Sequence, residues 1–304
     1  MKIKIIYWIW LGAMMLASCD KEDDLTPSGE REDYFSVSAS DTIGDPEAAL
    51  RYRFYSCNKV HLLFNDTLQH EQRGTYADGT PYWFTEVIDL PYTIESTGSG
   101  LRFLYLTDLE DQKKGAEFVE KYILPHVSGE MRPYSVFLVE KLEQKKGSKW
   151  KIIDYYAGRR CLAVNVASIL EMDDEEEIAE WSTDLFYDMI ISKINSWDKE
   201  ALEEFYAFCA PYYDEYYTTY AEELGWSKKP TNEQLLELGF IGGPSGSFFE
   251  EQEEDFENYM DALFYWEEDE PFEEYYAGYA KVLRKYEILR NIIEDHGYKF
   301  NRGE

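Results

Sequence analysis

Tyr134-Ser135-Val136-Phe137-Leu138-Val139 is a strand-like run near the middle of this 304-residue chain. Its β-branched and aromatic side chains are typical of a strand. Working outward, further strand-like and helical runs alternate on both sides of it. We expect strands over 59–64, 83–88, 150–156 and 161–166, and helices over 46–57 and 113–122. The part of the chain before about residue 166 therefore predicts a mixed sheet accompanied by helices.

The chain after residue 175 is expected to be helical almost throughout, over 175–195, 199–208, 212–224, 232–238, 250–266 and 272–294. The last helix is the most regular, because its apolar residues recur at helical spacing and form a continuous stripe. This stripe consists of Tyr275, Tyr279, Val282, Tyr286, Leu289 and Ile293. The opposite, polar face is expected to carry Lys281, Arg284, Lys285, Arg290 and Glu294. Pro271 lies at the expected start of this helix, and Gly297 lies just beyond its expected end.

These two halves together predict the α+β class: an N-terminal mixed sheet with helices, followed by a helical C-terminal part. The Gly242-Gly243-Pro244-Ser245-Gly246-Ser247 run lacks the preceding strand of a nucleophile elbow and the lysine of a phosphate loop. We expect it to be a loop between helices. The acid-rich stretch 250–274 is expected to be a solvated face, with a cation-binding or docking surface as the alternative.

The N-terminus has the pattern of a lipoprotein signal peptide. Lys2 and Lys4 precede an apolar run over 5–16, which ends in Leu16-Ala17-Ser18-Cys19. The run is too short to span a bilayer, which takes about 20 apolar residues. We therefore expect residues 1–18 to be removed and Cys19 to be lipidated.

The residues after Cys19 indicate where the protein is exported. Asp20-Lys21-Glu22-Asp23-Asp24 resembles the export signal with which Bacteroidetes lipoproteins reach the outer face of the outer membrane. We expect an acidic flexible tether over 19–42 and a single folded domain over 43–304. The predicted location is the outer membrane, held by N-terminal acyl chains and facing the cell exterior.

Composition excludes some partners. The chain has 61 Asp and Glu against 30 Lys and Arg, a formal net charge of −31, so it cannot neutralise nucleic-acid phosphates. The aromatic content of 17% suits both cores and surfaces that contact sugars. Cys57, Cys161 and Cys209 form no Cys-x-x-Cys pair, and we expect three buried free thiols. The four histidines stand apart and offer no metal or catalytic motif.

Several short stretches resemble the zinc metallopeptidase lipoproteins of Bacteroidetes, which are encoded beside outer-membrane glycan importers. The similar stretches are 132–139, 239–241 followed by 254–256, and 279–283 with Gly297-Tyr298. The resemblance implies a gluzincin-like fold and, as partners, components of a glycan importer or glycans themselves.

The chain departs from this family in the motif helix. Active members have His-Glu-x-x-His, in which two imidazoles bind zinc and the glutamate is the general base. The matching stretch here is Asp184-Leu185-Phe186-Tyr187-Asp188, and Glu254 matches the third ligand. Leucine cannot accept a proton, and two aspartates prefer harder ions than zinc. We therefore assign no catalytic residue, no metal ligand and no cofactor.

Two alternatives for these acids stay open. Asp184 and Asp188 could form a solvated stripe or pair with Arg159 or Arg160, while Glu254 could favour a helix N-terminus. Asp184, Asp188 and Glu254 could instead form a weak calcium or magnesium site.

The resulting functional hypothesis is a catalytically inactive metallopeptidase homologue that acts as a binding or scaffolding component of a glycan-uptake system. The alternatives are a carbohydrate-binding surface lipoprotein, which needs exposed aromatic rings, and a hydrolase that uses a non-standard carboxylate site. Acid pairs for glycoside hydrolysis are possible in so acidic a chain, but only their separation in space can identify them.

Overall fold

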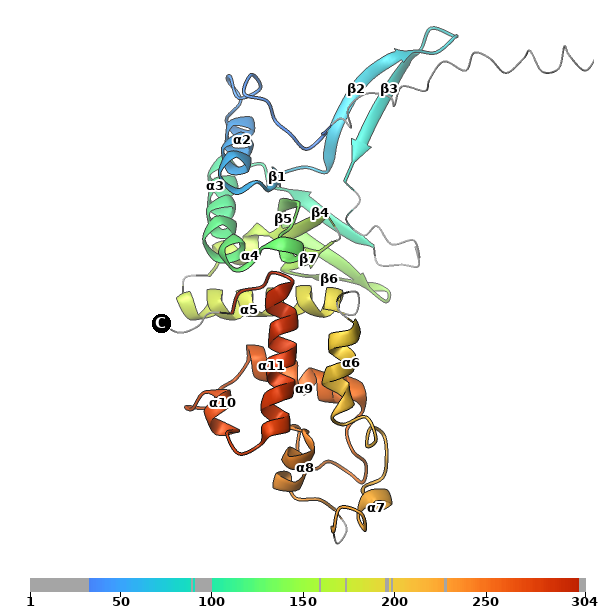
Figure 1. The fold of residues 1–304 in the computed structure, drawn as a ribbon. Helices are drawn as coiled ribbons and strands as arrows, with labels where there is room; N and C mark the ends of the chain where they lie inside the picture. Colours follow the sequence, from blue (N-terminus) through green and yellow to red (C-terminus); the bar gives the residue numbers. More distant parts are fainter. Residues whose placement is uncertain are drawn as a thin grey trace, which may run out of the picture. The chain divides into compact units, whose positions relative to one another are not determined.

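The computed structural model describes residues 33–88, 90, 100–158, 160–172, 174–194, 197, 199–226 and 229–300. The chain divides into two compact units, Met1–Ser36 and Val37–Glu304, and the fold below belongs to the second. This unit has an N-terminal sheet with helices and a helical C-terminal part (Figure 1). The expected order of sheet and helices is confirmed. The predicted signal peptide 1–18, the lipidated Cys19 and the acidic cluster 20–24 lie outside the described residues.

The main sheet is built around β5, Ser135–Lys146, and begins with the run quoted above. β5 pairs in parallel with β1, His61–Leu63, and with β8, Cys161–Asn165. Antiparallel pairs complete the mixed sheet: β4, Leu101–Tyr105, and β6, Lys149–Ile152, pair with β5, and β7, Tyr155–Ala157, pairs with β8. The first half of β5 and all of β8 are buried, as expected of parallel strands covered on both faces.

A separate two-stranded sheet is formed by β2, Thr67–Thr75, and β3, Pro81–Val87. The Asp78-Gly79 turn joins them, and Gly79 adopts φ +87°, which a residue with a Cβ rarely does. The sequence predicted β3 but not β2, because β2 is polar and most of its side chains are exposed.

Three helices accompany the sheet: α2, Pro46–Asn58, α3, Leu109–Phe118, and α4, Val166–Leu170. The Asp45 carboxylate caps α2 by accepting from the backbone N–H groups of Glu47 and Ala48. Single π and 3₁₀ turns follow α3 over Val119–Ile123, Leu124–His126 and Gly129–Met131. Gly115 lets α3 approach closely, because a Cβ there would lie 3.0 Å from both Leu138 of β5 and Val166 of α4.

The long helix α5, Glu175–Ile194, lies between the sheet and the remaining helices (Figure 1). Its buried face carries Trp181, Leu185, Phe186, Met189, Ile190 and Ile194. These side chains belong to one hydrophobic core that also includes residues of β5, β8, α9 and α11. α5 is therefore the element that joins the sheet to the helical part.

The helical part consists of α6, Lys199–Ala207, α7, Tyr217–Tyr220, α8, Asn232–Leu238, α9, Gln252–Phe264, α10, Phe272–Tyr275, and α11, Ala280–Asp295. α11 packs against α6, α8 and α9. Gly297 lies just beyond α11 with φ +107°, in the position expected from the sequence. Of the helices in the described part of the chain, none combines the length and apolar content needed to cross a bilayer.

Two predicted helices are wrong. The one expected over 272–294 is interrupted between α10 and α11, so Tyr275 leaves the predicted stripe and is 49% exposed. The one expected over 212–224 is reduced to α7, because Asp214 adopts a left-handed conformation with φ +61° that a helix cannot continue through.

Candidate functional site

The stretch compared above with the metallopeptidase motif, residues 184–188, lies in α5. Leu185 points into the core and has 0% exposure, whereas Asp184 and Asp188 are exposed on the opposite face. Position 185 is where an active member would need a solvent-accessible carboxylate. In this fold the position belongs to the core instead.

Tyrosine hydroxyls hold the two aspartates. Tyr265 donates a hydrogen bond of 2.8 Å to Asp184, and Tyr155 donates one of 2.8 Å to Asp188. Burial and the nearby carboxylates raise the pKa of Tyr155 and Tyr265, so both hydroxyls stay protonated and act as donors. Asp184 and Asp188 are thus acceptors in a surface network.

The sequence also offered Arg159 and Arg160 as partners for the two aspartates. Arg160 lies with its guanidinium 5.2 Å from the ring centre of Tyr134. Arg159 lies outside the described residues.

Glu254 is exposed in the first turn of α9, where an acid favours the helix dipole. Within the described ranges, no group of three or more His, Cys, Asp or Glu is arranged to hold a metal ion. The structure therefore does not bring Asp184, Asp188 and Glu254 together as the calcium or magnesium site that the sequence left open.

The residue after Glu254 forms a buried ion pair that the sequence did not indicate. Asp255 and Lys285 both have 0% exposure, and the Lys285 ammonium lies 2.6 Å from each oxygen of Asp255. Tyr213 donates a 2.5 Å hydrogen bond to the same carboxylate. The ammonium also donates to the Gly239 carbonyl at 3.1 Å, and the Cys209 sulfur lies 3.5 Å from it.

Lys285 was expected on the polar face of the last helix, and this expectation is wrong. Its position follows Val282 by three residues and precedes Leu289 by four, which places it on the buried stripe itself. That spacing is the signal that could have located it. Because Asp255 lies on α9 and Lys285 on α11, the pair joins these two helices through the core.

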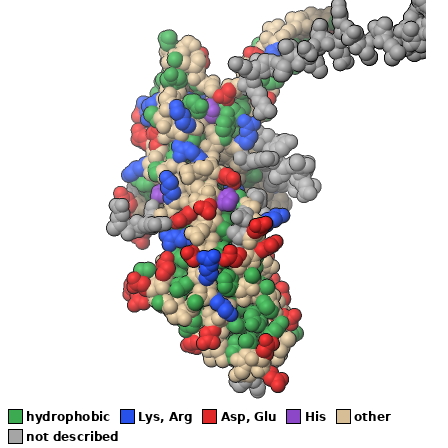
Figure 2. Space-filling view, in the orientation of Figure 1, with side chains coloured by type: hydrophobic (Ala, Val, Ile, Leu, Met, Phe, Trp, Pro, Cys, Tyr) green, Lys and Arg blue, Asp and Glu red, His purple; other side chains and the backbone are tan. Residues whose placement is uncertain are grey.

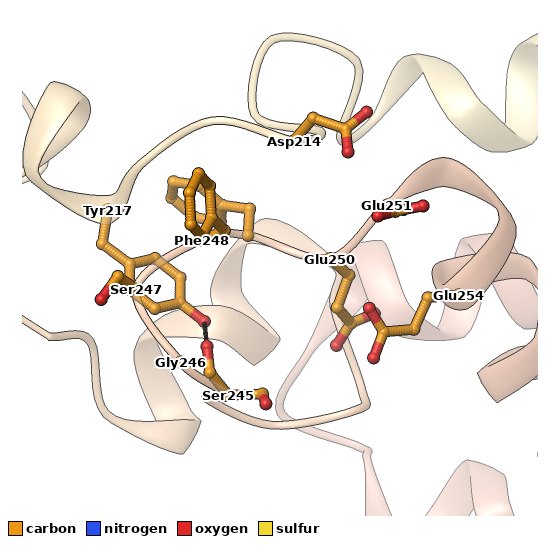
Figure 3. Close-up of a pocket in the computed structure, with 10 residues that line it drawn as sticks. Asp214, Tyr217, Ser245, Gly246, Ser247, Phe248, Glu250, Glu251 and Glu254 are labelled. Carbon is orange, nitrogen blue, oxygen red and sulfur yellow. Dashed lines mark hydrogen bonds between the residues drawn. The ribbon is translucent and has the colours of Figure 1, made fainter.

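A pocket of about 350 Å³ lies beside this pair, where the loop before α9 meets the residues that precede and begin α7 (Figure 3). Four carboxylates line it, those of Asp214, Glu250, Glu251 and Glu254. Aromatic rings and hydroxyls complete the wall: Tyr217, Phe248, Phe249, Ser245 and Ser247. The site therefore combines apolar ring surface with hydrogen-bond acceptors.

Backbone contacts hold the two sides of the pocket together. The Tyr217 N–H donates to the Ser247 carbonyl at 3.0 Å, and the Phe249 N–H donates to the Glu215 carbonyl at 2.9 Å. The Tyr217 hydroxyl donates to the Ser245 carbonyl at 3.1 Å (Figure 3). The Gly242–Ser247 run is thus a loop between α8 and α9, as expected, and it forms one wall of the pocket.

Glu250 is the most unusual side chain of the pocket. It is only 7% exposed, and one oxygen, Oε2, accepts from the Asn258 amide at 3.0 Å. The other oxygen, Oε1, is buried and has no hydrogen-bond partner among the described residues. Burial and the charge of Asp255 raise the pKa of Glu250 to about 7.

Glycine at position 242 makes room for this carboxyl group. A Cβ there would overlap both the Glu250 carboxylate and the Asn258 amide. The sequence offered no signal for Glu250, because it is one acid among many in a stretch expected to be solvated. Acidic side chains do occur across the helical part in the view of Figure 2, but their exposure differs from residue to residue.

The three described cysteines are free thiols. Cys161 and Cys209 are buried as expected, but Cys57 is exposed on α2, so its predicted burial is wrong.

Comparison of the chain with models of protein families, with curated proteins and with solved structures finds no match.

Proposed function

We propose that this chain is a lipid-anchored protein of the cell exterior that binds a ligand for a glycan-uptake system and does not hydrolyse peptides. The Leu16-Ala17-Ser18-Cys19 sequence and the acidic residues after it support the anchor and the location. The similarity of short stretches to the zinc metallopeptidase lipoproteins of Bacteroidetes supports a gluzincin-like ancestry and a role beside a glycan importer.

The loss of peptidase chemistry is supported by α5. Asp184 and Asp188 accept hydrogen bonds from tyrosines, and Leu185 is part of the core. A general base must reach a water molecule next to the substrate. A leucine in the core cannot take that role, and a carboxylate at the same position would be buried away from water.

The observation that carries the binding role is the pocket of about 350 Å³ between α7 and α9. Sugars offer hydroxyl groups as donors and C–H faces as apolar surface. The carboxylates of the pocket can accept from the hydroxyl groups, and the exposed ring of Phe248 can pack against a C–H face. Phe248 is exposed and lies 4.0 Å, between ring centres, from the exposed ring of Tyr216.

Glycan binding by the full-length protein in neutral detergent micelles tests this proposal. We expect retention on immobilised glycans, lost in Ser247→Trp, which fills the pocket. Ser56→Trp, on an exposed position of α2, adds the same ring elsewhere and is expected to retain binding. If the two variants bind equally well, or the parent protein binds no glycan, the proposed role is wrong.

The pKa of Glu250 favours a second candidate, glycoside hydrolysis. A carboxyl group with a pKa of about 7 can donate a proton to a leaving glycosidic oxygen at neutral pH, while a second carboxylate assists on the other side. Release of reducing ends from a bound glycan, abolished in Glu250→Gln, would favour this candidate over simple binding.

A further inference from the structure

The charged side chains that line the pocket are all acidic. Four of its lining residues are acids, and none of the described lining residues is a lysine or an arginine. The nearest buried cation, Lys285, is already paired with Asp255. A negative pocket of this kind repels phosphates and carboxylates and favours a ligand that carries positive charge.

The surroundings of Glu250 indicate where the positive charge of a ligand would lie. Its Oε1 atom is buried without a partner, whereas buried acceptors in folded proteins are normally hydrogen-bonded. The neighbouring charges of Asp255 and Glu254 oppose ionisation of Glu250, and the Asn258 amide favours it. A cationic group of a ligand in the pocket would offset these neighbouring negative charges and stabilise the ionised carboxylate of Glu250.

A bare metal ion fits the pocket less well. Calcium needs roughly six to eight oxygen ligands that converge on one point. No group of three or more acidic, histidine or cysteine side chains in the described ranges has the arrangement that would hold an ion. The carboxylates are spread around the wall, so they suit a ligand with several polar atoms.

We propose that the pocket binds an amino sugar, with the ammonium group beside Glu250 and the sugar ring against the exposed ring of Phe248. The hydroxyl groups of the sugar donate to Asp214, Glu251 and Glu254. This assignment rests on the proposed function, because it names the ligand class of the same pocket.

Calorimetric titration of the full-length protein in neutral detergent, at pH 7, tests the assignment with three matched probes. Glucosamine, glucose and glucuronate have the same ring and carry a positive, zero and negative charge. We expect glucosamine to bind about tenfold or more tighter than glucose, which corresponds to one charge-assisted hydrogen bond, and glucuronate to bind most weakly.

Two variants test whether the preference for glucosamine depends on Glu250. Glu250→Gln keeps the size of the side chain, and we expect it to remove the preference for glucosamine over glucose. Glu237→Gln, an exposed acid on α8, changes the net charge by the same amount and is expected to keep the preference. Circular dichroism confirms that both variants are folded.

The outcomes separate this assignment from the proposed function. Equal binding of glucosamine and glucose, or a preference that survives Glu250→Gln, overturns the amino-sugar assignment, as does the absence of binding to all three sugars. A saturable calcium chloride titration lost in Glu250→Gln would assign the pocket to a metal ion and overturn it too. In each of these cases the proposed function would still hold if the parent protein is retained on immobilised glycans and Ser247→Trp is not.

Discussion

Leu185 and Glu250 show how the surroundings of a single side chain decide its chemistry. In the proposed metallopeptidase resemblance Leu185 takes the position of the general base, yet it has no exposed surface. Glu250 belongs to a stretch rich in acids, yet it is the one whose carboxyl group lies buried in the wall of a pocket. Burial favours the neutral form of a carboxyl group, so it raises the pKa of Glu250.

Restoring the motif is expected to damage the fold and not to create an enzyme. The triple variant Asp184→His, Leu185→Glu, Asp188→His places an unpaired carboxylate in the core, and we expect it to lose several kcal/mol of unfolding free energy. Leu185→Ala alone should cost about 2–5 kcal/mol because it leaves a cavity. Urea denaturation measures both.

The control is the double variant Asp184→His, Asp188→His, which changes only exposed positions and is expected to stay folded. A triple variant that is as stable as the parent and binds zinc stoichiometrically would show that position 185 faces a site.

Glu250 makes stability depend on pH. Its pKa rises from 4.5 in the unfolded chain to about 7 in the folded one, so the folded state holds its proton more tightly. The difference corresponds to about 3 kcal/mol. This contribution is complete below the unfolded value and is lost as the pH rises through about 7. Glu250→Gln should therefore flatten the fall in stability between about pH 4.5 and pH 7.

Urea denaturation at several pH values checks this expectation. The Asp255, Glu254 and Lys285 charges around Glu250 are retained in the variant, so they contribute equally to both curves. Parallel curves for the parent and Glu250→Gln would mean that Glu250 titrates normally in the folded state.

At the scale of elements, the helical part depends on contacts between segments that are far apart along the chain. α9 and α11 are joined by Asp255 and Lys285, with Tyr213 donating from the segment before α7. The rings of Phe205 and Tyr259 each lie 4.5 Å from the ammonium. A buried pair of this kind orients two helices, although its net contribution to stability is small because both charges lose their hydration.

Breaking the pair is expected to be far more harmful than removing it. Lys285→Met leaves Asp255 buried and uncompensated, and we expect a loss of about 3–5 kcal/mol. The double variant Lys285→Met, Asp255→Leu should recover much of this. Lys281→Met, one turn earlier and exposed, is the control and should have little effect. Equal destabilisation by the single and double variants would contradict the account.

The short helix α8 depends on its N-terminal cap. The Thr231 side chain accepts from the Gln234 N–H, and the Gln234 side chain accepts from the Thr231 N–H. Thr231→Ala should cost about 1 kcal/mol of unfolding free energy, and Thr231→Ser should restore it. Thermal denaturation of the three proteins measures this, and an alanine variant as stable as the parent would mean that the cap is dispensable.

At the scale of the whole molecule, we propose that the net charge of −31 and the predicted N-terminal signal together decide how the protein is held at a membrane. An anionic lipid surface repels so acidic a body, so attachment requires acyl chains. If the chain is anchored in this way, the anchor and the folded unit are separable.

Cys19→Ala is expected to remove the lipid and release the folded protein from membranes. Membrane fractionation and mass spectrometry of the N-terminal peptide measure the two effects. Cys57→Ala, which removes the exposed thiol of the folded unit, should stay in the membrane fraction. A Cys19→Ala protein that still partitions into membranes would refute lipidation at this position.

Elements with strong local signals were predicted correctly. Residues 136–139 of β5 and 161–164 of β8 are continuous apolar runs, and α2 and α8 begin at recognisable caps. β2 was missed because it is polar and largely exposed, whereas the short β4 was missed although four of its five residues are apolar. The break between α10 and α11 was missed because the apolar spacing continues across it.

The order of amino acids was sufficient for the class of the fold, the sheet followed by helices, because hydrophobic periodicity is a local property of the chain. The candidate site was decided by the tertiary structure. Whether Leu185 faces solvent, whether Lys285 is buried and whether Glu250 holds a proton all depend on neighbours that other elements supply. Desolvation and pairing act through space, so they arise only when α5, α9, α11 and the loop before α9 are packed together.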